Sequence, residues 1–190
     1  MKKKLKTGIG LFAYNRPSHL KRVLISLENF KLENIIVFLD GPKNENESII
    51  QENILFILKN SKIHNLKIIK QKKNIGLCKS LTNGINYLSK NYDFFIVLED
   101  DCIPYRNFFK YFDICFKKYE FDMEINSICS FQFKELADNK QNVLKFMKLD
   151  HFIPWGWGSW SYKWKRYLKD KNKKYKNYPS FMDKFNNIRY

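Results

Sequence analysis

Two alternating patterns of apolar residues run through the first hundred positions of the chain. Short apolar runs typical of strands lie at 7–14, 34–40, 65–71 and 93–100. Apolar residues at helical spacing fill the intervals between them, at 17–29, 47–60 and 77–90. This order predicts an α/β fold, in which a mostly parallel sheet has right-handed crossovers and helices on both faces.

The pattern after residue 104 is mixed. It predicts a helix over 107–120 and strands over 126–133 and 143–149, with a loop between the two strands. All four tryptophans follow within ten positions, from Trp155 to Trp164. We find no internal repeat and no linker that would divide the chain, so we expect one domain over 1–190.

Composition leaves several kinds of partner open. With 190 residues, of which 44% are hydrophobic, the chain can bury a sizeable core. Its net charge of +16 favours anionic partners such as nucleotides, phosphorylated substrates, nucleic acid or an acidic membrane surface. The chain is also rich in Lys, Asn and Ile, a bias that a genome poor in G and C imposes without regard to function. The charge therefore permits these partners without selecting one.

The cysteines and the N-terminal segment argue against several classes of protein. The four cysteines form no CxxC pair and no group with histidine, which disfavours a zinc site or a disulfide framework and favours a reducing cytoplasm. The apolar stretch at 8–14 ends on Asn-Arg-Pro, so it fits a first strand better than a signal peptide. No stretch approaches the roughly 20 apolar residues of a membrane span. Any membrane contact is therefore expected to be peripheral.

Polar residues and glycine follow the four predicted strands at their carboxyl ends, where open parallel sheets bind ligands. They are Asn15 and Arg16, then Asp40, then Asn74 and Gly76, and finally Glu99, Asp100 and Asp101. Gly76 would let the backbone approach a ligand and expose helix N–H groups to a diphosphate. Taken singly, Asp40 fits an ordinary turn and Arg16 an ordinary surface residue. Their shared edge is what favours a binding site.

Glu99, Asp100 and Asp101 are the most informative of these residues because they follow a strand that looks fully buried. Two carboxylates about 4 Å apart repel by roughly 4 kcal/mol at an effective dielectric near 20, so three should take up protons or bind a cation. Carboxylate oxygens suit Mn²⁺ or Mg²⁺, whose coordination is completed by water and phosphate. The alternative is a solvated turn, which we would prefer for an isolated triplet. At this edge of the sheet we expect a metal site.

The segments around these residues resemble the nucleotide-sugar-binding half of GT-A-fold glycosyltransferases. The resemblance is to the N-acetylglucosaminyltransferase I group and to bacterial enzymes related to glycosyltransferase family 2. It covers roughly residues 7–168 and is carried by "LFAYNRPSHLKRVL", "IIVFLDGP", "NIGL" and above all "FFIVLEDDCIPYRNFFKYF". The resemblance implies a GT-A (Rossmann-like) fold with a donor-binding half at 1–104. It also implies an acceptor-side half at 105–190, which we expect to be incomplete at its C-terminus.

The resemblance also implies roles for individual residues on the donor side. Asp101 would be the direct metal ligand, and Glu99 and Asp100 would contact the sugar or ribose of the donor. Asp40 would accept the uracil N–H, and Arg16 would help to hold the nucleotide. The remaining residues of the implied donor-binding set are Ala13, Asn15, Asn74 and Gly76.

Roles on the acceptor side follow from the same resemblance, through "DHFIPWGWGSWSYKW". Trp155 and Trp157 are expected on a glycine-containing loop, with their rings against the acceptor sugar, whereas Trp160 and Trp164 are expected to pack in the core. An inverting enzyme needs a general base on this side. Asp183 and Asp150 are the candidates, and a base beyond residue 190 is the alternative.

The implied function is metal-dependent transfer of a hexosyl or N-acetylhexosaminyl group from a nucleotide donor, UDP-linked in the first instance. The acceptor would be a glycan or a lipid-linked glycan of a bacterial surface polysaccharide or lipooligosaccharide, in lipopolysaccharide-type biosynthesis. The enzyme would lie in the cytoplasm, and peripheral contact with the anionic inner face of the membrane is left open.

Three alternatives were weighed against this function. A nucleotidyltransferase is expected to carry a glycine-rich basic loop after the first strand, and "AYNRPSHL" has none. Nucleic-acid binding agrees with the charge and with the aromatic residues among the lysines of 157–178, but it leaves the acidic strand end unexplained. A donor-binding fragment without transfer activity is the third. We expect no nucleic-acid partner.

Overall fold

The computed structural model describes residues 5–131, 148 and 152–174. Six described strands form one sheet in the order β3-β2-β1-β4-β6-β5. The strands are β1 (Thr7–Ala13), β2 (Ile35–Leu39), β3 (Lys67–Lys70), β4 (Phe94–Glu99), β5 (Ile128–Cys129) and β6 (Trp157–Trp160). The first four are parallel, whereas β6 runs antiparallel to both β4 and β5. The predicted mostly parallel α/β fold is confirmed.

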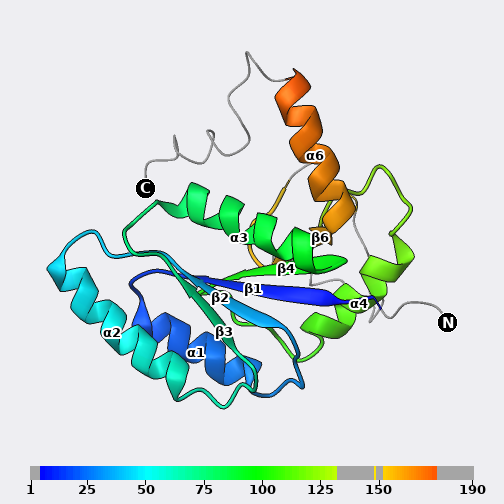
Figure 1. The fold of residues 1–190 in the computed structure, drawn as a ribbon. Coiled ribbons are helices and arrows are strands. Elements are labelled where there is room, and N and C mark those ends of the chain that lie inside the picture. The colour runs from blue at the N-terminus through cyan, green and yellow to red at the C-terminus, as the bar shows by residue number, and fades with distance from the viewer. Residues whose placement is uncertain (1–4, 132–147, 149–151, 175–190) are drawn as a thin grey trace.

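Five described helices cover the two faces of this sheet (Figure 1). They are α1 (Pro17–Leu27), α2 (Glu45–Lys59), α3 (Leu77–Asn91), α4 (Phe108–Lys118) and α6 (Ser161–Lys174). One buried cluster joins α1, α2 and α4 to the sheet, and a second joins α3 to the opposite face. No described helix has both the length and the apolar run that a membrane crossing requires.

Local sequence signals explain where α1 and α2 begin. Pro17 occupies the first turn of α1, where its missing N–H costs no hydrogen bond. Asn44 precedes α2 and its side chain accepts the N–H of Glu47, so α2 begins two residues earlier than the apolar period indicates. The buried residues of α1 repeat at helical spacing as predicted: Leu20, Val23, Leu24 and Leu27.

The second half of the chain corrects two predictions. The strand expected over 126–133 is reduced to the two residues of β5. The loop expected around the glycines ends at Trp157, because Trp157–Trp160 form β6 and pair with β4. Trp157 and Trp160 therefore lie in a strand, and Trp164 lies in α6. The strand predicted over 143–149 lies outside the described residues except for Lys148.

Lys163 in α6 is almost fully buried, at 2% exposure, and holds the segment that follows α4. Its ammonium donates to the backbone carbonyls of Tyr119 (3.1 Å), Asp122 (2.8 Å) and Ile125 (2.7 Å). It also lies 3.6 Å from the centre of the Trp160 ring, a close cation–π contact. One cation thus connects α6 to the loop between α4 and β5.

We expect Lys163→Met to lower the free energy of unfolding by about 2–4 kcal/mol, because three carbonyls lose a buried charged donor. Urea denaturation followed by circular dichroism measures the loss. Lys165→Met removes an exposed lysine from the same helix and should change stability by less than about 0.5 kcal/mol. Equal stability of the two variants would show that the Lys163 contacts contribute nothing.

Candidate functional site

The carboxyl ends of β1, β2 and β4 meet at one edge of the sheet. Because β1 lies between β2 and β4, the register places Ala13 beside Leu39 and Phe12 beside Glu99. The segments after these strands therefore share a rim. Arg16 from the first of them reaches Asp100 and Asp101 after β4, across 84 and 85 positions of sequence. The sequence-based expectation that these strand ends converge is met for β1 and β4.

Arg16 bridges two consecutive carboxylates in this rim. Its Nη1 donates to Oδ2 of Asp101 at 3.0 Å, and its Nη2 donates to Oδ1 of Asp100. Asp100 is buried and also accepts a hydrogen bond from the backbone of Tyr14. Asp101 is 41% exposed at its side chain, and Arg16 is 44% exposed. The guanidinium therefore joins a buried acid to an exposed one.

The three acids carry more negative charge than Arg16 neutralises. Burial raises the pKa of Glu99 to about 7, and the charges of Asp101 and Asp100 add to this while Arg16 opposes it. Burial also raises the pKa of Asp100, although the hydrogen bond from Arg16 offsets part of the effect. Three carboxyl groups around one guanidinium are therefore an environment that favours a further cation.

The acids after β4 could hold a divalent ion only at an open site, where water and phosphate supply the other ligands. Among residues 5–131, 148 and 152–174, no group of three or more His, Cys, Asp or Glu side chains converges to cage an ion. Mn²⁺ and Mg²⁺ do not need such a cage, because one or two carboxylates suffice when water and phosphate supply the other ligands. Arg16 acts as a stand-in cation and shows where positive charge is held. Asp101 is the exposed carboxylate that can serve as ligand.

Asp40 is held by hydrogen bonds from the chain itself. Its Oδ1 accepts the N–H groups of Gly41 (2.8 Å) and Ile75 (3.0 Å). Its Oδ2 accepts from the side-chain amide of Asn74 (3.1 Å) and the N–H of Gly76 (3.0 Å). The residue is 5% exposed, and four donors fill the acceptor sites of its carboxylate. A uracil N–H would therefore have to displace one of these donors, and the predicted base contact stays a prediction.

Asp40 fixes the loop that leads into α3. Gly76 precedes this helix with φ +83°, a conformation that favours glycine, and a Cβ placed on it would meet nothing within 4 Å. A Cβ on Gly41 would lie 2.3 Å from the carbonyl carbon of Lys73, so the loops after β2 and β3 touch through backbone. The space beside Gly76 is open, and the close approach of a ligand there stays a prediction.

Glu47 is a residue of this rim that the sequence reasoning missed. Its carboxylate accepts from the Tyr14 hydroxyl, from the Asn15 side chain (3.4 Å) and from the Lys43 N–H (2.7 Å). These hydrogen bonds hold the pKa of Glu47 below its usual range, and the bond from the Tyr14 hydroxyl has the largest effect. The signal was present as Asn44 followed three residues later by Glu47, a capping-box spacing. Glu47 thereby ties the segment after β1 to the segment after β2.

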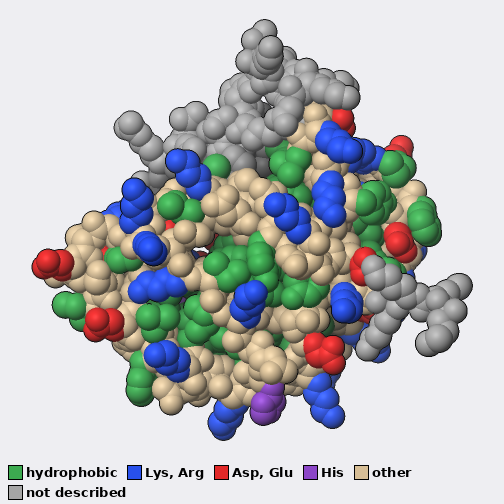
Figure 2. Space-filling view, viewed as in Figure 1, with side chains coloured by type: hydrophobic (Ala, Val, Ile, Leu, Met, Phe, Trp, Pro, Cys, Tyr) green, Lys and Arg blue, Asp and Glu red, His purple; other side chains and the backbone are tan. Residues whose placement is uncertain are grey.

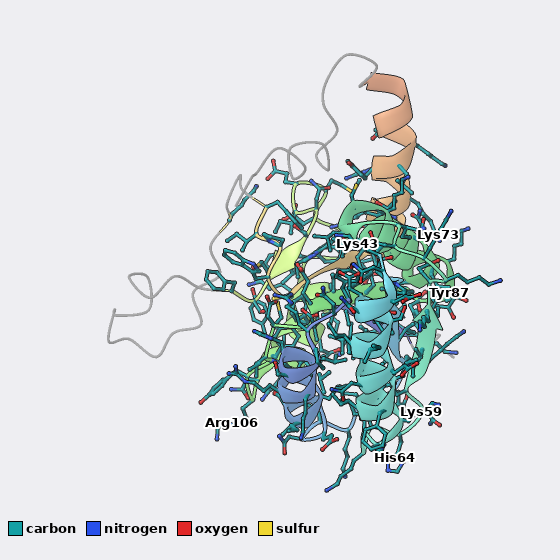
Figure 3. All side chains as sticks on the ribbon, turned by 90° about the vertical axis from the view of Figure 1, so that its left-hand side faces the viewer. Lys43, Lys59, His64, Lys73, Tyr87 and Arg106 are labelled. Atoms are coloured by element: carbon teal, nitrogen blue, oxygen red, sulfur yellow. The ribbon has the colours of Figure 1, made fainter. Side chains whose placement is uncertain are left out.

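Gln51 also connects the segments that follow β1 and β2. Its side-chain amide donates to the backbone carbonyls of Tyr14 (3.2 Å) and Asp40 (2.6 Å). Figure 3 shows Lys43 and Lys73 towards the same end of α2, whereas Lys59 and His64 lie towards the opposite end. Two lysines therefore flank the rim on the side of β2 and β3.

The acceptor-side predictions divide into three outcomes. Trp157 is buried in β6, where its ring packs edge-on against Phe95 and Phe152, so it is a packing residue and not an exposed platform. Trp155 is 46% exposed and lies edge-to-face with Phe131 at 4.9 Å. Asp150 and Asp183 lie outside the described residues. Of the two predicted acceptor rings, only Trp155 is open to a ligand.

A family model for glycosyl transferase family 2 matches residues 9–183. The chain belongs to this family. The predicted GT-A fold and the predicted glycosyltransferase family are thereby confirmed. The narrower likeness to the N-acetylglucosaminyltransferase I group stays a prediction.

Solved structures resemble the glycosyltransferase in fold. The 4-diphosphocytidyl-2C-methyl-D-erythritol synthase from Anaerococcus prevotii DSM 20548 is 13% identical, with a TM-score of 0.52 over 94% of this chain and 84% of that one. At this identity the likeness shows a shared fold alone. A comparison with curated protein sequences gives no match.

Two further structures are weaker likenesses. A mannosyltransferase from Pyrobaculum calidifontis, in complex with GDP-Man and Mn²⁺, is 9% identical with a TM-score of 0.48 over 70% of this chain. GalNAc-T7, with UDP, GalNAc and Mn²⁺, is 17% identical with a TM-score of 0.37 over 52% of this chain. The glycosyltransferase spans 37% of the first protein and 19% of the second. Neither likeness supports an argument about its substrates.

Proposed function

We propose that this glycosyltransferase takes its sugar from a nucleoside diphosphate donor bound at the rim of β1, β2 and β4. The observation that carries the proposal is the set of three acids after β4, which one guanidinium does not neutralise. Asp101 would hold a Mn²⁺ or Mg²⁺ ion. When bound, this ion would supply electrostatic stabilisation of the diphosphate as it departs.

The residues of the chain would bind and orient the donor as follows. The open space beside Gly76, at the start of α3, would receive the diphosphate, because helix N-termini favour anions. Lys43 and Lys73, which follow β2 and β3, would add positive charge on that side of the rim. Glu99, at the end of β4, would accept a hydroxyl of the sugar or ribose, whereas buried Asp100 would orient Arg16. Ala13 and Asn15 would line the nucleoside side of the rim.

UDP is the nucleotide we propose, on the strength of the resemblance in the segments after β1 and β4. Asp40 cannot supply the base contact while its carboxylate holds the loop before α3. Base recognition would instead use backbone groups of the segments that Glu47 and Gln51 hold in place. The donor site would belong to 1–104 and the acceptor site to 105–190.

The proposed acceptor is a glycan or a lipid-linked glycan of a bacterial surface polysaccharide or lipooligosaccharide. Trp155 and Phe131 support this proposal as an exposed aromatic pair, a surface suited to a sugar face. Asp150 or Asp183 would remove the proton of the acceptor hydroxyl, unless a residue beyond 190 does so. We place the enzyme in the cytoplasm. Its charge of +16 supports peripheral contact with anionic lipid.

The distribution of charged side chains on the surface bears on the nucleic-acid alternative. Figure 2 shows Lys and Arg side chains scattered over the visible face and interspersed with apolar and acidic ones. A nucleic-acid-binding face usually gathers its cations in a stripe or patch. On this face the charge therefore gives no specific support to an RNA or DNA partner.

Calorimetric titration of UDP and, in parallel, GDP into the protein tests the proposed donor site. With Mn²⁺ or Mg²⁺ present, one of the two nucleotides should bind, and EDTA should weaken that binding at least ~10-fold. A folded protein that binds neither nucleotide with either metal would refute the donor site. Salt-sensitive RNA binding that EDTA leaves unchanged would point to the nucleic-acid alternative.

A further inference from the structure

Arg16 occupies the carboxylate oxygens that a divalent cation at this site would need. Its two terminal nitrogens donate to two different acids, Asp100 and Asp101, which follow each other in sequence. On Asp101 the guanidinium takes Oδ2, and Oδ1 lies 3.7 Å from the Cys102 sulfur, a weak donor. A cation that binds Asp101 therefore meets Arg16 on the same carboxylate.

The backbone of Arg16 is fixed, whereas its side chain is exposed enough to exchange one of its two partners. The residue precedes α1, its carbonyl accepts the N–H of Leu20 at 3.1 Å, and Pro17 follows it. Its side chain is nearly half exposed, and so is that of Asp101. Ion pairs with this exposure contribute little to stability, so the Asp101 contact can break easily. The contact to buried Asp100 differs, because that acid needs a compensating charge.

We propose that Arg16 is an exchangeable counter-ion of the metal site. With Nη2 anchored on Asp100, the Nη1 side of the guanidinium leaves Asp101 when a divalent cation binds there and donates to a phosphate oxygen of the donor. The proposal rests on the proposed function and adds a sequence of contacts to it. Arg16 then opposes metal binding before the donor arrives and supports donor binding afterwards.

Charge and geometry both favour this exchange over simultaneous binding. A dication and a guanidinium on one carboxylate repel each other, and the repulsion falls when the guanidinium turns to an anion. A guanidinium has five N–H donors in a planar fork, so it can keep one acid and exchange the other partner. A diphosphate bridged by the cation would present oxygens close to the carboxylate that Arg16 leaves.

The test compares Arg16→Gln with Arg22→Gln, a control that removes an exposed arginine from α1 and so changes the net charge equally. Free Mn²⁺ is followed by its electron paramagnetic resonance signal during titration of each protein. Arg16→Gln should bind Mn²⁺ alone about 10-fold more tightly than the unaltered chain, because the competing cation is gone. Arg22→Gln should stay within about twofold.

The affinity for nucleotide should change in the opposite direction to the affinity for Mn²⁺. With saturating Mn²⁺, the nucleotide that binds the unaltered chain should bind Arg16→Gln about 10-fold more weakly, because one charged donor to the diphosphate is lost. Circular dichroism confirms that the variant is folded. If it is not, Arg16→Lys takes its place, since a single ammonium cannot span both acids and should shift both affinities in the same directions by about threefold.

The possible results separate this proposal from the proposed function. Tighter Mn²⁺ binding together with weaker nucleotide binding supports both. Mn²⁺ binding that is equal in Arg16→Gln, Arg22→Gln and the unaltered chain overturns the exchange and leaves the metal site intact. Unchanged nucleotide affinity in Arg16→Gln overturns the exchange as well. Absence of Mn²⁺ binding in all three proteins overturns the metal site, and the exchange with it.

Discussion

Asp40→Ala should lower the free energy of unfolding by about 3–5 kcal/mol, because it removes a buried acceptor of four hydrogen bonds. The donors left behind include the backbone N–H groups of Gly41, Ile75 and Gly76. Backbone donors that lose their partner in this partly buried loop cost free energy. Urea denaturation measures the loss, and amide hydrogen exchange at Ile75 and Gly76 should show local opening before α3.

Asp113→Ala is the matched control for this prediction. Asp113 is an exposed carboxylate of α4 whose ion pair with Lys117 spans one helical turn. Its removal should change stability by about 0.5 kcal/mol or less. The two roles considered for Asp40 give opposite results: a base-reading side chain would lose nucleotide affinity and keep its stability. A stable Asp40→Ala protein that no longer binds nucleotide would therefore restore the role expected from the sequence.

The first half of the fold could be predicted chiefly because β2 and most of β4 are continuous apolar runs. All five residues of β2 are buried, and so are the first five of β4, so their runs are unambiguous in sequence. The order of elements then fixed which strand ends share a rim. The joint position of Arg16 and the β4 acids follows from this, but their mutual contact does not, since side-chain pairing across two loops leaves no periodic signal.

β6 could not be predicted because it contains Gly158. In a sequence, glycine more often indicates a loop than a strand. A Cβ on Gly158 would lie 2.6 Å from the carbonyl oxygen of Phe95, so the glycine permits close pairing with β4. In the sequence the same residue, beside Trp157, indicated a loop. The hydrogen bonds of Asp40 to the loop before α3 were not predicted for a related reason, since these partners lie more than 30 positions away. Long-range contacts decide both cases.

Asp101→Asn should reduce turnover of the donor by about 10²- to 10³-fold, or about 3–4 kcal/mol of transition-state stabilisation. The substitution keeps the shape of the side chain and removes the charge of the exposed carboxylate that is proposed to bind the cation. Stability should change by less than about 1 kcal/mol, because the side chain is 41% exposed and its pair with Arg16 is open to solvent. Initial rates across a Mn²⁺ series measure the effect.

Asp113→Asn serves as the control here, since it removes an exposed carboxylate of α4 that lies outside the proposed site. Its rate should equal that of the unaltered chain at every Mn²⁺ concentration. For Asp101→Asn, added Mn²⁺ should restore little of the rate, because the amide oxygen is neutral and a weaker ligand for a hard cation. A variant that keeps full turnover would remove Asp101 from the site and leave Glu99 as the remaining carboxylate of β4. If turnover were lost together with the fold, the effect would belong to the ion pair with Arg16 and not to a bound cation.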